Sequence, residues 1–182
     1  MRIVGSAGVG AMFLLASWAI ADFSAAAQVM SNDSNILIMD NCLPGDSGWN
    51  PTGGCAMNPK RGDVSFAEFG QLLSSPLISA LVGHPSWRNE PSHLVASNRG
   101  RVRVTNRGGR AHTLTEVENF GGGSVAAFNI SMTKAPECPL TPGQVQDALA
   151  PGQSVTLTNL DPGLHKFQCC FHPWMRATIR VN

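Results

Sequence analysis

The last twenty residues of the chain, 163–182, place the strongest constraint on what it can fold into. Within seven positions they bring together a thiol (Cys169), an imidazole (His172) and a thioether (Met175). These three side chains are the ligand types of a soft copper site. The rest of the chain can therefore be interpreted as the scaffold that holds this segment.

Strand parity separates the two adjacent cysteines in this segment. If residues 163–169 form a strand, successive side chains point to opposite faces of the sheet. Phe167 marks the buried face, and Cys169 then points inward with it. Cys170 is expected to point outward beside Gln168, where it cannot share a metal ion with Cys169.

A thiolate, one imidazole and a thioether leave a copper site incomplete. A blue-copper centre has two imidazoles and one thiolate in a trigonal arrangement, with a weak axial thioether. The second imidazole has to come from elsewhere in the chain. His112 is the best candidate, because it follows an alternating strand pattern (residues 102–106) and a glycine turn. A single strand histidine is more often structural, but the site requires another imidazole.

The remaining aromatic and imidazole side chains receive simpler interpretations. His165 lies on the same strand face as Phe167 and is expected to be a hydrogen-bonded residue of the interior. His84 and His93 lie outside the motif and are expected to be structural or exposed. Trp174 is expected to shield the site from water or to contribute to a docking surface.

The first residues of the chain are expected to be a secretory signal. Arg2 precedes an apolar run at 9–20, and small residues follow at 25–27, as they do before a signal cleavage site. The apolar run is shorter than a typical membrane span. We assign 1–27 as a signal peptide and expect a periplasmic or secreted protein without a membrane span in its mature form. A retained N-terminal anchor is the alternative.

Charge and cysteine content restrict the partners and the compartment. The formal net charge of +1 gives no reason to expect a nucleic-acid partner. The five cysteines of an exported chain can form at most two intramolecular disulfides, which leaves one thiol over. Cys42 and Cys55 lie in a loop rich in glycine and proline, which a disulfide between them would restrain. Other pairings of these two cysteines remain open.

Periodicity predicts several short strands and two short helices. Ser65 and Glu68 have the spacing of a capping box and predict a helix that ends near Ser74. A second short helix is expected at 76–83. Strands are expected at 36–39, 94–97, 101–105, 111–115 and 154–158, in addition to the C-terminal segment. Short strands separated by turns indicate an antiparallel sandwich.

Three segments resemble the cupredoxin pattern, in particular that of plastocyanin and amicyanin. They are residues 102–106 leading to His112, residues 150–155, and residues 162–175 with the final ligand loop. The resemblance covers roughly 90–182. It implies a mainly β, cupredoxin-like Greek-key sandwich.

The domain organisation follows from where this resemblance begins. Residues 91–182 are expected to form the copper-binding core. Residues 28–90 are expected to form an N-terminal extension packed on the sandwich and carrying one or two short helices. This extension departs from the small cupredoxins, and so does the doubled cysteine at 169–170.

The resemblance also implies a function. One type 1 copper ion would be bound by His112, Cys169, His172 and Met175. The protein would be a monomeric electron carrier outside the cytoplasm and not an enzyme. Its redox partners would be proteins that dock transiently near His172 and Trp174.

All five cysteines can then be assigned a role. If Cys169 is the copper thiolate and Cys42 pairs with Cys55, the remaining pair is Cys138 and Cys170. A disulfide between these two would hold the long loop between residues 121 and 143 against the metal end. It would also prevent Cys170 from competing for copper or becoming oxidised.

Three alternatives use the same residues or the same fold. A copper-binding protein for sequestration or delivery would need no electron-transfer turnover. A copper oxidase or nitrite reductase would need more histidines than the five present, which include no His-x-His pair. Zinc is disfavoured because a thioether is a poor fourth zinc ligand.

Overall fold

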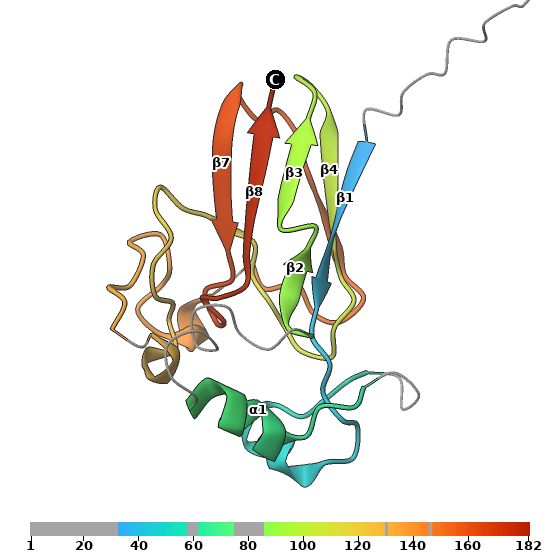
Figure 1. Ribbon diagram of the computed structural model, residues 1–182, viewed down its shortest axis with the longest axis vertical. Coiled ribbons are helices and arrows are strands. Elements are labelled where there is room, and N and C mark those ends of the chain that lie inside the picture. Colours follow the sequence, from blue (N-terminus) through green and yellow to red (C-terminus); the bar gives the residue numbers. More distant parts are fainter. Residues whose placement is uncertain (1–32, 58–61, 75–85, 130, 146) are drawn as a thin grey trace, which may run out of the picture. The chain divides into compact units, whose positions relative to one another are not determined.

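Two four-stranded sheets face each other in the computed structural model, which describes residues 33–57, 62–74, 86–129, 131–145 and 147–182 (Figure 1). The first sheet has the order β2-β1-β4-β6, formed by β2 (Arg88–Glu90), β1 (Asp33–Met39), β4 (Arg101–Asn106) and β6 (Ser154–Leu157). The second has the order β3-β8-β7-β5, formed by β3 (His93–Ala96), β8 (Arg176–Val181), β7 (Gly163–Gln168) and β5 (Thr115–Glu116). The predicted mainly β sandwich is confirmed.

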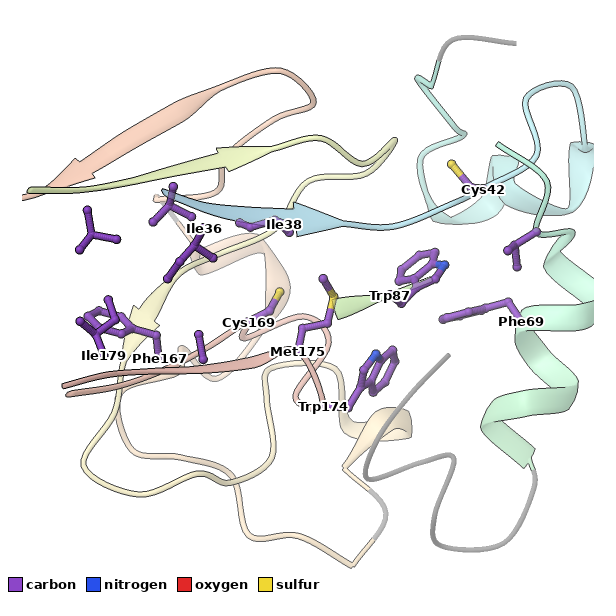
Figure 2. Packing of buried hydrophobic residues seen from close by; sticks show 14 of the residues in the cluster. Ile36, Ile38, Cys42, Phe69, Trp87, Phe167, Cys169, Trp174, Met175 and Ile179 are labelled. Carbon is purple, nitrogen blue, oxygen red and sulfur yellow. The ribbon is translucent and has the colours of Figure 1, made fainter. Parts of the chain in front are cut away.

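The core lies between the two sheets because side chains alternate in and out along each strand. In β4 the pattern places Val102 and Val104 inside and Arg101 and Arg103 outside. Ile36 and Ile38 of the neighbouring strand β1 lie beside them, and Phe167 and Ile179 of the other sheet also belong to this core (Figure 2). Ala177 and Val181 of β8 complete the buried set on that sheet. This apolar layer fixes the positions of the strand ends, where the metal-ligand candidates lie.

The sheets are not purely antiparallel, which corrects the expectation from sequence. β1 pairs with β4 in parallel, and β3 pairs with β8 in parallel. Hairpin turns join strands that are consecutive in the chain, whereas these two pairs bring together strands that are not consecutive. The chain passes from one sheet to the other between them, so the spacing of turns could not reveal the pairing.

The expected boundary at residue 90 also needs correction. β1 is an inner strand of the first sheet, with Ile36 opposite Val104 and Ile38 opposite Asn106. Residues 33–39 thus belong to the sandwich and not to an extension packed on it. The apolar run at 36–39 correctly predicted a strand, but periodicity carries no information about which strand lies beside it.

Outside the sheets, the described part of residues 40–87 is built around aromatic packing. It contains a 3-10 helix, η1 (Ser47–Thr52), and the predicted helix, α1 (Phe66–Ser74). The amide of Glu68 donates to the Ser65 hydroxyl at 3.1 Å, which caps the first turn of α1. The Phe69 ring lies 5.2 Å from Trp49 and 4.5 Å from Trp87, measured between centroids. These contacts attach α1 next to the end of the sandwich.

Three expectations lie outside the described residues: the helix at 76–83, the structural or exposed position of His84, and the signal peptide at 1–27. Among the helices that are described, none has the length and apolar character needed to cross a membrane.

Both expected disulfides are present, Cys42–Cys55 and Cys138–Cys170, and Cys169 is free. Strand parity correctly separates Cys169 from Cys170. The expectation that Cys170 and Gln168 face outward needs a correction, because both are fully buried.

The covering of Cys170 comes from the long loop after β5. A second, smaller core forms there from Val117, Ala135, Cys138 and Cys170. The Gln168 side chain accepts from the Gly121 amide at 3.0 Å and donates to the Gly122 carbonyl at 3.3 Å. The outer face of β7 near the site is therefore buried under this loop, and the Cys138–Cys170 bridge links the loop to the end of β7.

Candidate metal centre

Three of the predicted ligands meet at one end of the sandwich. The ligand atoms of His112, Cys169 and His172 all lie within 4.8 Å of one another, and all three residues are buried. The Cys169 Sγ atom lies 3.6 Å from the Nδ1 atoms of both histidines. The two Nδ1 atoms are 3.2 Å apart. One thiol and two imidazole nitrogens thus converge on a single small space.

The loop that carries Cys169 and His172 is closed by backbone hydrogen bonds. Cys169 follows the last residue of β7, on the same inner face as Phe167. Its amide donates to the Met175 carbonyl at 3.0 Å, and the Met175 amide donates to the His172 carbonyl at 2.9 Å. The Arg176 Nε atom donates to the Pro173 carbonyl at 2.8 Å. The ligand loop is therefore held in place without a metal ion.

His112 is held by an isolated β-bridge to Leu149. Its amide donates to the Leu149 carbonyl at 3.1 Å and its carbonyl accepts from Leu149 at 2.7 Å. The buried Asn106 side chain organises the preceding turn, since its amide group donates to the carbonyls of Arg110 at 2.6 Å and Leu149 at 2.8 Å. Asn106 was not predicted as a site residue.

Asp40 is a second residue of the site that the sequence analysis missed. It directly follows β1 and is fully buried, and its carboxylate contacts the Nε2 atom of His112. The carboxylate also accepts from the Gly109 amide and, at 3.1 Å, from the Arg110 amide. The only available signal was an acidic residue directly after an apolar strand. That signal becomes informative only when β1 is known to pair with β4.

The electrostatics of the cluster favour a thiolate. Burial raises the pKa of Cys169, but the hydrogen bonds and charges of His112 and His172 outweigh it and bring the pKa well below its usual value. Burial lowers the pKa of His112, yet Asp40 and Cys169 outweigh this and raise it to about 9. For His172, burial prevails and lowers the pKa. A buried thiolate with two imidazoles is a donor set that suits copper.

Met175 is also at this end of the sandwich. Its side chain is fully buried and belongs to the same hydrophobic cluster as Cys169 (Figure 2). This placement is compatible with a thioether that approaches the ligand cluster from the interior. Its role as the axial ligand stays a prediction.

His172 and Trp174, near which a redox partner is expected to dock, are both buried. Their exposed fractions are 7% and 5%. The His172 ring lies 5.1 Å from Trp87, 5.5 Å from Trp174 and 6.0 Å from Phe128, between centroids. These rings shield the imidazole from water. A mainly apolar cavity of about 630 Å³ borders His172, Trp87 and Phe128.

The other described histidines lie away from the cluster. The Nδ1 atom of His165 lies 2.6 Å from Glu116, and its Nε2 atom lies 2.7 Å from the Asp161 carbonyl. The Nδ1 atom of His93 lies 2.7 Å from the Thr178 hydroxyl. Both are hydrogen-bonded as expected, but His165 is only partly buried, so its expected place in the interior is not confirmed.

Gly108 gives a direct test of how tightly the turn before His112 packs. A Cβ atom at this position would lie 2.4 Å from the Asp40 carboxylate. We expect Gly108→Ala to lower the free energy of unfolding by about 1–3 kcal/mol, the usual cost of overpacking an interior. Chemical denaturation of the metal-free protein measures this.

Gly70→Ala is the matched control, because Gly70 lies in α1 with no atom near the added methyl group. It should be neutral or slightly stabilising. If the two variants have the same free energy of unfolding, the turn can shift to accommodate the methyl group at position 108 without loss of stability.

No family model matches this sequence, and no curated protein matches it. Among solved structures, a purple cupredoxin from Nitrosopumilus maritimus is similar, with 16% identity over 82% of this chain and 100% of that chain, and a TM-score of 0.42. A reduced amicyanin mutant is 22% identical over 51% of this chain and 71% of its own, with a TM-score of 0.34. The Cu(I) form of another amicyanin mutant is 20% identical over 52% and 73%, with a TM-score of 0.35.

These matches are distant, and the fold and the site follow from this chain's own geometry. The resemblance predicted from sequence is confirmed in two respects, the face-to-face pair of sheets and the buried ligand cluster near the C-terminus. The chain has the two-sheet fold and the His–Cys–His cluster of a cupredoxin.

Proposed function

We propose that this protein is a type 1 copper protein that carries single electrons outside the cytoplasm. The observation that carries the proposal is the buried convergence of the only free thiol, Cys169, with the imidazoles of His112 and His172. When bound, one copper ion would supply a Cu(II)/Cu(I) couple. His112, Cys169 and His172 would hold it, with Met175 as the weak fourth ligand.

The surroundings of the cluster suit electron transfer because they resist rearrangement. The loop with Cys169 and His172 is closed by its own backbone bonds, and His112 is fixed by the bridge to Leu149. Donor atoms that are already held in place have little freedom to reorganise between two oxidation states. Trp174, Trp87 and Phe128 pack around the His172 ring, which is 7% exposed.

Partner and compartment are part of the same proposal. A redox partner would dock transiently over the aromatic side chains that cover His172, without direct access to the imidazole. Two disulfides in one small domain are typical of proteins from oxidising compartments, which supports a periplasmic or secreted location. We expect the protein to act as a monomer and not as an enzyme.

Copper titration of the metal-free protein, with both disulfides intact, tests this function. We expect one equivalent of Cu(II) to bind and to produce an intense visible thiolate-to-copper band, because the thiolate pKa is already depressed. The paramagnetic-resonance spectrum should be that of a type 1 site, and voltammetry should show reversible one-electron cycling. A colourless protein that binds only Cu(I) would instead support copper sequestration or delivery.

A further inference from the structure

The carboxylate of Asp40 is fixed against the outer nitrogen of His112. Asp40 is 0% exposed, and its carboxylate contacts the His112 Nε2 atom. The backbone amides of Gly109 and Arg110 donate to the same carboxylate. The turn packs closely on the carboxylate, since a Cβ atom at position 108 would lie 2.4 Å from it. The carboxylate therefore has little room to turn away from the imidazole.

This contact determines which nitrogen of His112 is available to a metal ion. A carboxylate at Nε2 favours a proton there. The other nitrogen, Nδ1, faces the Cys169 Sγ atom at 3.6 Å and the His172 Nδ1 atom at 3.2 Å. Asp40 thus leaves Nδ1 as the nitrogen that faces the cluster.

The second imidazole has a different environment. The His172 ring packs among Trp87, Phe128 and Trp174. Within the part of the chain that the structure describes, no hydrogen bond joins a carboxylate to His172. The two imidazoles are therefore unequal: one is backed by a buried negative charge and the other by aromatic rings.

We propose that Asp40 is a positioning residue that orients His112 for metal binding and lowers the reduction potential of the copper site. The proposal rests on the proposed copper function of the cluster. A carboxylate hydrogen bond makes an imidazole a stronger donor. A negative charge in a site of low dielectric also stabilises the more highly charged of two ions, Cu(II) over Cu(I).

Asp40→Asn tests the proposal, because it removes the charge and nearly preserves the shape. We expect the Co(II) dissociation constant of the variant to rise about tenfold or more, the usual effect of removing such a partner. In the copper-loaded variant the midpoint potential should rise. A tenfold shift of relative affinity from Cu(II) toward Cu(I) corresponds to about 59 mV for one electron.

Asp46→Asn is the matched control. The Asp46 carboxylate accepts from the amides of Gly48 at 2.9 Å and Phe66 at 2.8 Å, and among the described residues it has no hydrogen bond to a metal-ligand candidate. Its replacement should weaken local structure without changing the Co(II) affinity or the copper potential. A change common to both variants would identify a general loosening of residues 40–66.

The outcomes separate this proposal from the proposed function. The Asp40→Asn protein could be less stable and yet keep the Co(II) affinity and the copper potential of the wild type. In that case Asp40 would only stabilise the turn before His112, and the inference would be overturned. If the wild-type protein binds Co(II) but forms no blue Cu(II) site, the electron-transfer function fails. The Co(II) comparison would in that case still decide whether Asp40 orients His112.

A measurement on the wild-type protein covers the case in which the variant does not fold. Proton and nitrogen NMR of the Zn(II)-loaded protein should show a slowly exchanging, downfield proton on Nε2 of His112. Metal coordination through Nε2, or rapid exchange of that proton with solvent, would overturn the proposal.

Discussion

Replacing Cys169 by serine should abolish the visible thiolate-to-copper band of the copper-loaded protein. Cys169 is the only cysteine outside a disulfide, and its Sγ atom lies at the same distance, 3.6 Å, from both imidazole nitrogens. A serine hydroxyl is a hard, weakly acidic ligand and cannot replace a soft thiolate. Absorption and paramagnetic-resonance spectra at one equivalent of copper measure the result.

The control for this variant is the double substitution Cys138→Ser with Cys170→Ser. It removes the neighbouring sulfur atoms together, so that no new free thiol arises, and it should keep the band. If the band survived in Cys169→Ser, another sulfur would have to be the copper ligand. That result would contradict the assignment of Cys169 by strand parity.

The same double substitution should have a large effect on stability. Cys138 and Cys170 are 32 residues apart, and the chain-entropy treatment of a loop of this size gives a loss of about 3–4 kcal/mol in unfolding free energy. The bridge also closes the small core around Gln168, which supports the inner position of Cys169. Chemical denaturation of the metal-free protein, compared with wild type, measures the loss.

Removal of the other disulfide provides the comparison. Cys42 and Cys55 are separated by 13 residues, so the double serine variant should lose about 3 kcal/mol, somewhat less than the longer bridge. A loss below about 1 kcal/mol on removing Cys138–Cys170 would contradict the expectation. It would mean that the loop after β5 is held by packing and not by the covalent link.

Local patterns were sufficient for much of the fold and of the ligand set. The alternation of Val102 and Val104 with arginines predicted β4, and the position of Phe167 assigned the inward face to Cys169. These inferences use only the spacing of side chains along one strand. The convergence of Cys169 and His172 with His112 required in addition the chemical argument that the site needs a second imidazole.

The features that were missed depend on contacts between distant segments. The parallel pairing of β1 with β4 is one of them, and it brings Asp40 to His112 across 72 positions of sequence. The covering of Gln168 by the loop after β5 is another. Neither follows from periodicity. The spacing of apolar residues in a strand does not indicate which strand pairs with it, and the sequence of a loop does not indicate which surface the loop covers.

The two disulfides also limit the metal chemistry of the chain. A chain with all five cysteines reduced offers five thiols to soft metal ions, and adjacent thiols such as Cys169 and Cys170 could chelate Cu(I) together. Once both bridges have formed, four sulfur atoms are withdrawn and a single thiolate donor is left. Oxidation of the cysteines therefore leaves one thiolate donor, so the single copper site proposed above depends on both bridges being formed.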